Sequence, residues 1–405
     1  MTTRATSQLL DLLLGDDRKA AVAVRVFSAA ESGAAESWNG AIALAKAWKV
    51  IPQLFERLRR LRVTLPDAET GKLKLEFLKS FRQSAFRAAK AIEAIRSLEQ
   101  AGVRVAAFKG IASIAVLYAD PKRRTIHDAD LLIAREHLPA ALACLERQGF
   151  ARRGSETVAQ YLRFVEESPG FAGNQALTLY GEGGSEIDLH WDLPGSGLPA
   201  EQILERAVRV DLMGSPIPVV DAKDGFLLTV HHAIRENLAL ESVCRDFLDI
   251  RLWLDHLRKI GQLQAGMKRV AQSRCKVAAL ALAGLLSGYD NAAAAAEGAA
   301  LLSDLASPAE RRSAATLADL FLYQLSHGRL GKDVFYLVHS RPWRQIFNGL
   351  TADWSGYRQS MRTLEKQLED DRPLHERFAQ LVKSIPSLRG LRLARELACI
   401  KYGKK

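Results

Sequence analysis

Residues 127–133 read His-Asp-Ala-Asp-Leu-Leu-Ile, and this stretch decides both the fold and the chemistry that we expect of the chain. Side chains alternate between the two faces of a strand, so Asp128 and Asp130 point to the same side. Two aspartates on one face repel each other unless a cation lies between them. Mg²⁺ or Mn²⁺, which prefer oxygen ligands, would remove that repulsion. Paired acids also occur as solvated surface residues or as partners of arginine. The neighbouring segments must therefore show whether this pair binds a metal.

A second acidic strand is predicted at residues 186–191, which read Glu-Ile-Asp-Leu-His-Trp. Glu186, Asp188 and His190 share one face, and three apolar side chains share the other. If this strand lies beside the first, Asp188 completes a cluster of three carboxylates. Such a cluster can hold two divalent metals for an in-line displacement at phosphorus.

Turn and helix signals around these strands predict a small α/β unit over residues 100–220. Its other expected elements are a strand at 103–108, a short helix at 111–118, a helix at 138–148 and a strand at 176–180. The last strand would pair antiparallel with the second acidic strand around a glycine-rich turn. Between the first strand and the short helix, Gly110 would let backbone amides approach a phosphate, and Lys109 would place a positive charge against it.

Helical periodicity dominates on both sides of this unit. Over residues 77–98 apolar side chains recur at the spacing of one helix face, and Gly102 follows where a helix C-terminal glycine is expected. The predicted fold class is α+β. Its expected domains are an N-terminal helical region (1–99), the α/β core (100–220) and a larger C-terminal helical domain (221–405).

The composition is that of an ordinary soluble globular protein, with 48% hydrophobic and 25% charged residues. The longest apolar stretch, residues 277–286, is shorter than the roughly 20 residues that span a bilayer. The N-terminus lacks the long apolar core of a secretory signal. We therefore expect a cytoplasmic protein without a membrane span. The net charge of +11 favours anionic partners: nucleotides, nucleic acid or a phosphorylated small molecule.

Taken together, the motifs resemble those of the uncharacterised nucleotidyltransferase family, within the DNA polymerase beta-like nucleotidyltransferase superfamily. The resemblance covers roughly residues 75–260, and the residues that carry it are 108–110, 117–121, Arg124, 128–132 and 187–191. It implies a small mixed sheet flanked by helices. It also implies transfer of a nucleoside monophosphate from an NTP, with ATP binding expected, to an acceptor hydroxyl with loss of pyrophosphate.

The resemblance also assigns roles to the acids. Asp128 and Asp130 would ligate the metals, whereas Asp188 would hold the catalytic metal and help to deprotonate the acceptor. Gly110 occupies the place of the superfamily's phosphate-contacting glycine. The chain departs from the superfamily at residues 111–112, which are Ile-Ala where Gly or Ser is usual, so its contacts with a triphosphate would differ from the usual ones.

Six residues are candidates for nucleotide binding: Lys109, Gly110, Ser113, Arg124, His190 and Arg245. Arg124 either neutralises a phosphate or pairs with Asp120. His190 either orients Asp188, touches a ligand, or is a hydrogen-bonded structural histidine.

The downstream helical region offers a further choice. Arg245 and Asp249 lie one helical turn apart, which favours an internal ion pair. Alternatively, Arg245 and His232 line the cleft from the helical side. The basic segment 383–405 either touches RNA or an anionic membrane surface, or forms a docked helix with a solvated basic face.

The favoured function is nucleotidyl transfer to a small molecule, a sugar, a peptide or a protein side chain. The long helical flanks, and the Ile-Ala sequence at residues 111–112, are also compatible with a non-catalytic nucleotide- or partner-binding scaffold with the same fold. An RNA or tRNA acceptor is compatible with the charge, but aromatic residues total only 7%, so this reading ranks lower. The geometry of the three acids discriminates between enzyme and scaffold.

Overall fold

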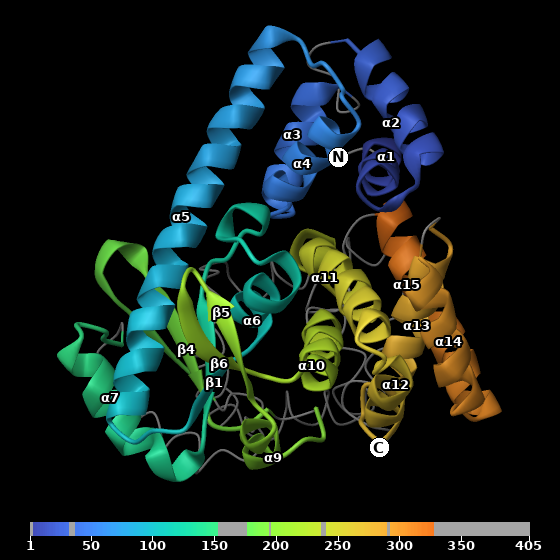
Figure 1. Cartoon of the computed structure of the whole chain (residues 1–405). Coiled ribbons are helices and arrows are strands. Elements are labelled where there is room, and N and C mark those ends of the chain that lie inside the picture. Colours follow the sequence, from blue (N-terminus) through green and yellow to red (C-terminus); the bar gives the residue numbers. More distant parts are fainter. Residues whose placement is uncertain are drawn as a thin grey trace, which may run out of the picture. The chain divides into compact units, whose positions relative to one another are not determined.

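The structure is a computed structural model that describes residues 3–31, 37–152, 176–193, 196–235, 240–289 and 292–327. Its residues up to Ala314 belong to one compact unit. This unit contains both acidic strands and the sheet in which they lie (Figure 1).

Helices precede the sheet, as the periodicity predicts. They are α1 (Thr3–Leu14), α2 (Asp17–Ala29), α3 (Trp38–Ala47), α4 (Ile51–Arg60) and α5 (Asp67–Gln100). Asp16 caps α2 by accepting a 2.7 Å hydrogen bond from the backbone N–H of Lys19. On α4, the buried Arg57 donates to the carbonyl oxygens of Leu12 and Gly15, so its guanidinium satisfies the C-terminal end of α1.

The long helix α5 changes partners along its length. Its first half packs on α4, where the rings of Phe77 and Phe55 stack with centroids 4.2 Å apart. Its second half packs on the strands and buries Ala88, Ile92 and Ile95. The predicted apolar face is therefore buried from Ala88 onward, whereas Phe81 in its first half is 37% exposed. The chain leaves α5 through Gly102, whose φ of 74° favours glycine as the sequence suggests.

The sheet has six strands in the order β3-β4-β2-β1-β6-β5. Their bounds are β1 (Val105–Ala107), β2 (Ala129–Ile133), β3 (Ala176–Tyr180), β4 (Glu186–His190), β5 (Val208–Leu212) and β6 (Ser215–Val219). The β2–β4 and β1–β6 pairs are parallel, whereas the other three pairs are antiparallel. The fold is thus α+β with a mixed sheet, which confirms the predicted class.

The hairpin of β5 and β6 was not expected from the sequence, where Pro216 and Pro218 read as a transition between regions. Both prolines lie inside β6. β6 pairs with β1 at Val219, beyond both prolines, so their missing N–H groups cost no hydrogen bond to β1. Met213 and Gly214 form the turn with φ values of 55° and 77°. Alternation of apolar residues could not reveal this hairpin because the prolines interrupt it.

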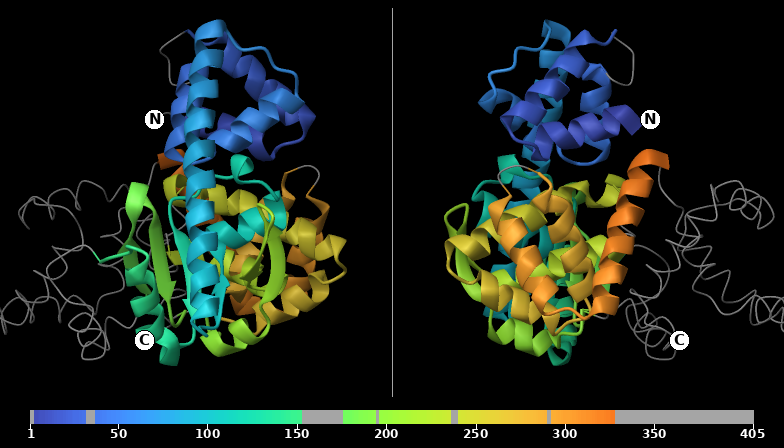
Figure 2. Two further views of the ribbon diagram at one scale, coloured as in Figure 1. Left: turned by 60° about the vertical axis from the view of Figure 1, so that its left-hand side comes forward. Right: turned by 90° about the vertical axis from the view of Figure 1, so that its right-hand side faces the viewer.

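Helices cover both faces of the sheet. One face carries α5, which lies over the strands in the left view of Figure 2. Against β2 packs α6 (Lys109–Ser113), which continues as a π-helical turn (Ile114–Tyr118). The remaining helices are α7 (Leu138–Arg147), α9 (Ala200–Glu205), α10 (Ala222–Arg235), α11 (Leu240–Lys259), α12 (Leu263–Ala271), α13 (Lys276–Ser287), α14 (Ala293–Asp304) and α15 (Pro308–His327).

The C-terminal helices attach to the core through α10 and α11, which contact α6 and the π-helical turn. Trp253 and Leu254 of α11 and Leu282 of α13 are buried, so these helices have an apolar core of their own. Within the described residues, no helix combines the length and the apolar character that crossing a bilayer requires. The predicted domain limits at residues 99 and 220 remain predictions.

Candidate active site

The two acidic strands lie side by side. β2 and β4 are parallel neighbours, and Asp130 is directly opposite Asp188 in their register. His190 follows Asp188 by two residues and therefore shares its face. Asp130, Asp188 and His190 each offer a ligand atom, and these atoms all lie within 4.8 Å of one another. Alternation within each strand and adjacency between the strands together produce this cluster.

Asp130 is the buried centre of the cluster, with 2% of its surface exposed. Lys109 Nζ lies 2.5 Å from its Oδ1, and His190 Nε2 lies 3.1 Å from the same oxygen. Burial alone would raise the pKa of Asp130, but the charge of Lys109 and the contact with His190 hold that pKa well below its usual range. Asp130 therefore keeps its negative charge inside the protein.

Asp188 has the opposite electrostatic balance. Burial, followed by the negative charges of Asp130 and Asp128, raises the pKa of Asp188 to about 6. A hydrogen bond from Thr178 Oγ1 to Asp188 Oδ1, at 2.6 Å, opposes this rise. Lys109 does not supply enough positive charge for several carboxylates. Carboxylate oxygens that crowd together in this way fit a hard divalent cation.

Asp128 lies immediately before β2 and is half-buried. Its charge contributes to the raised pKa of Asp188. It is not a member of the group whose ligand atoms lie within 4.8 Å of one another; His190 takes the third place. The sequence leaves three roles open for His190: a ligand contact, an orienting group for Asp188, or a hydrogen-bonded structural histidine. In the structure its buried ring contacts Asp130, and its role in nucleotide binding remains a prediction.

Lys109 opens α6 with a φ of 47°, a left-handed conformation that lysine rarely adopts. Its ammonium group reaches Asp130 from this position. Ser113, at the other end of α6, is fully buried, and its Oγ has no hydrogen-bond partner in the part of the chain that the structure describes. Residues 111–112 are also fully buried, so apolar packing accounts for the Ile-Ala step. The nucleotide-binding role of Ser113 remains a prediction.

Gly110 has a packing role. A β-carbon at this position would lie 3.0 Å from Arg124 Nη1 and 3.0 Å from Ile126 Cγ2. Gly110→Ala is expected to lower the free energy of unfolding by about 1–3 kcal/mol, because the loop and the arginine must shift. Urea denaturation measures this loss.

The matched control for that substitution is Gly71→Ala in the interior of α5, where a β-carbon would meet nothing within 4 Å. It should stabilise the protein by about 0.5–1 kcal/mol. Equal stability of the Gly110→Ala variant and the wild type would contradict the packing role.

Arg124 is buried and pairs with Asp249 of α11 rather than with Asp120. Its Nη2 and Nε lie 2.6 and 2.8 Å from Asp249 Oδ2, and the Tyr118 hydroxyl donates to Asp249 Oδ1 at 2.8 Å. Asp120 instead pairs with Lys122 at 2.7 Å. The role of Arg124 in nucleotide binding remains a prediction.

The ion pair between Arg245 and Asp249 that the helical spacing favours does not form. Arg245 Nη1 donates to the carbonyl oxygen of Thr125 at 3.2 Å, at the end of the loop that leads into β2. His232 Nδ1 lies 2.5 Å from Asp246 Oδ2. Both side chains therefore contribute to the packing of α10 and α11 around the core, and their role in lining the cleft remains a prediction. The basic segment 383–405 lies outside the described residues.

The sequence reasoning missed Thr178, the residue that holds Asp188. A signal was available, because Thr178 lies opposite Asp188 in the register of the hairpin that the sequence predicts. It also missed Asp249 as the partner of Arg124. No local pattern could reveal that pair, because 125 positions separate the two residues.

The chain matches a model of a known protein family. A family model described as an uncharacterised nucleotidyltransferase matches residues 34–288, which is more than half of the chain. The match includes β1, β2 and β4 with the buried acidic cluster. No curated protein matches the chain.

Proposed function

Because the chain belongs to the family of uncharacterised nucleotidyltransferases, we propose that it transfers a nucleoside monophosphate from an NTP to an acceptor hydroxyl. Membership of the family makes the chain a transferase of phosphorus-containing groups. The observation that carries the finer proposal is the adjacent pair of the buried Asp130 and the half-buried Asp188, with Lys109 against Asp130. Two carboxylates at this separation repel each other, and such arrangements concentrate at sites that bind a cation and carry out chemistry.

The cluster fits a divalent cation, with Mg²⁺ or Mn²⁺ as the expected metal. Asp130 and Asp188 would hold it, with Asp128 and His190 as further ligands. Bound there, the metal would supply positive charge to the phosphates of the donor and favour ionisation of the acceptor hydroxyl.

Residues of this chain provide the other parts of the reaction. Lys109 adds a positive charge beside Asp130, where it can reach a phosphate oxygen of the donor. Thr178 binds Oδ1 of Asp188 and fixes the orientation of that carboxylate. In the transfer, the acceptor oxygen forms a bond to the α-phosphorus, the bond from that phosphorus to pyrophosphate breaks, and Asp188 helps to take the proton of the acceptor.

An assay with NTPs labelled at the α-phosphate tests the proposed function. Purified protein, a small-molecule and peptide extract and Mg²⁺ or Mn²⁺ should yield a labelled acceptor together with pyrophosphate. EDTA should abolish the product, because the carboxylates then have no cation to share. Metal-dependent binding of the NTP without any labelled product, pyrophosphate or hydrolysis would instead support the scaffold.

A further inference from the structure

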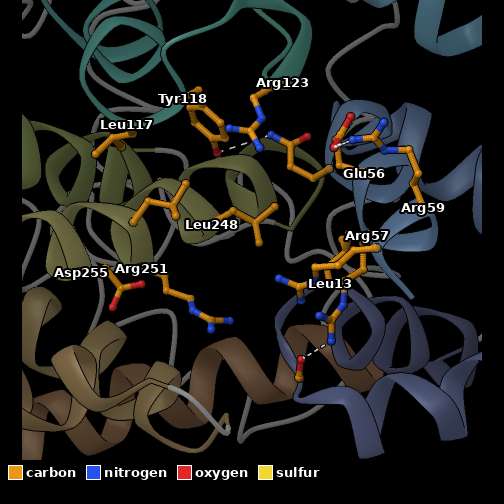
Figure 3. Close-up of a pocket in the computed structure, with 14 residues that line it drawn as sticks. Leu13, Glu56, Arg57, Arg59, Leu117, Tyr118, Arg123, Leu248, Arg251 and Asp255 are labelled. Atoms are coloured by element: carbon orange, nitrogen blue, oxygen red, sulfur yellow. Dashed lines mark hydrogen bonds and ion pairs between the residues drawn. The ribbon is translucent and has the colours of Figure 1, made fainter. Parts of the chain in front are cut away.

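A cavity lies on the side of the molecule formed by α1, α4, the π-helical turn and α11 (Figure 3). Its volume is about 860 Å³, within the range of roughly 300–1,000 Å³ that is typical of small-molecule sites. Asp130, Asp188 and His190 are not among the residues that line it. The cavity is therefore a place distinct from the carboxylate cluster.

Arginine dominates the charged lining of this cavity. The arginines are Arg57, Arg59, Arg60, Arg123 and Arg251, and the acids are Glu56 and Asp255. Arg57 donates hydrogen bonds to carbonyl oxygens at the end of α1. Arg59 Nη2 lies 3.6 Å from Glu56 Oε2. Neither Arg60 nor Arg123 has a carboxylate within 4 Å among the described residues, which leaves a surplus of positive charge.

Arg251 of α11 also lines the cavity. Figure 3 shows it extending from α11 into the cavity toward α1, and its Nη1 donates to the carbonyl oxygen of Leu14 at 2.7 Å. Burial and the charge of Arg60 lower the pKa of Arg251, although Asp255 opposes them. A guanidinium group does not lose its proton in a protein. Arg251 therefore stays charged beside the cavity and can bind an anion there.

The rest of the lining is suited to the body of a small ligand. Leu13, Leu117, Leu248 and Leu252 supply apolar surface beside the Tyr118 ring. Gln53 also lines the cavity, and its buried Oε1 has no hydrogen-bond partner among the described residues. That oxygen can accept a hydrogen bond from a hydroxyl or amine of the ligand.

We propose that this cavity binds a small molecule with at least two phosphate groups, at a site separate from the carboxylate cluster. Arg60, Arg123 and Arg251 come from α4, the segment before β2 and α11, so three separate elements supply the arginines of the cavity. Guanidinium groups bind phosphate in a bidentate manner, and more than one of them suits a diphosphate. The apolar walls can contact the part of the ligand that carries the phosphate groups.

The cavity shares Tyr118 with the buried network that supports the loop before β2. Tyr118 donates to Asp249, Asp249 pairs with Arg124, and Arg124 packs against Gly110. A ligand in the cavity would therefore contact Tyr118, which belongs to the hydrogen-bonded network that packs against Gly110, the residue next to Lys109.

Calorimetric titration of the full chain with pyrophosphate in EDTA tests this proposal. Without a metal the carboxylate cluster repels an anion, so binding reports on the cavity. The double variant Arg60→Gln/Arg123→Gln should bind pyrophosphate about tenfold or more weakly. Both side chains are exposed and neither forms a described hydrogen bond, so the fold should remain intact.

The matched control is Arg82→Gln/Arg147→Gln, which removes the same charge from exposed positions on α5 and α7. It should bind pyrophosphate as the wild type does. Lys109→Gln should also bind it normally. Loss of binding in Lys109→Gln but not in the cavity variant, equal losses in the cavity and control variants, or absence of binding by the wild type would overturn the proposal. None of these results depends on nucleotidyl transfer.

Discussion

Replacement of Asp188 by asparagine is expected to abolish nucleotidyl transfer while the protein stays at least as stable as the wild type. Asp188 lies opposite Asp130, and burial together with the charges of Asp130 and Asp128 raises its pKa to about 6. Removal of its charge relieves repulsion in the metal-free protein, so the free energy of unfolding should not fall. Activity should drop by at least about 10²–10³-fold, because the cation loses a ligand.

The companion substitution, Asp130→Asn, separates the electrostatic roles of the two acids. It should abolish transfer equally, but it also removes the carboxylate charge beside Lys109. Its free energy of unfolding should fall by about 1–3 kcal/mol. The double variant should lose no more activity than either single variant, since both residues serve one cation. Pyrophosphate release and urea denaturation measure the two quantities.

Asp304→Asn provides the control for these variants. Asp304 is an exposed residue at the end of α14, and its replacement should change neither activity nor stability. If Asp188→Asn transfers nucleotides at a rate close to that of the wild type, the proposed role of the cluster is contradicted. A large loss of stability in the same variant would show that Asp188 holds the fold together instead.

Removal of the buried charge of Arg124 should have the largest effect on stability. The Arg124 and Asp249 side chains are 2% and 1% exposed, and Tyr118 completes the group. Arg124→Met leaves the Asp249 carboxylate buried without its cation. The expected loss in the free energy of unfolding is about 3–5 kcal/mol. Urea denaturation followed by circular dichroism measures it.

The double variant Arg124→Met/Asp249→Leu tests the cause of this loss. Apolar residues of similar size should recover most of the stability, because no charge remains unpaired. If this double variant folds but fails to bind an NTP, Arg124 takes part in nucleotide binding, as its position in the sequence suggests. A loss below about 1 kcal/mol in Arg124→Met would contradict a buried ion pair.

Much of the site can be predicted because alternation along a strand is a local property. Residues 127–133 and 186–191 each place acids on one face whatever lies around them, and the hairpin of β3 and β4 follows from its turn. The apolar face of α5 is equally local. Two strands with acids on matching faces then need only to be neighbours for Asp130 and Asp188 to meet.

The sequence by itself therefore determined the acidic strands, the α+β class and the helical flanks. Only the tertiary structure decided which charges pair. Lys109 reaches Asp130 through an unusual backbone conformation, and Arg124 finds Asp249 on a distant helix. The arginine-lined cavity likewise exists only after α4 and α11 come together. The physical reason is the distance along the chain over which each property is determined. Adjacent residues determine backbone periodicity, whereas the packing of separate elements determines the partner of a buried charge.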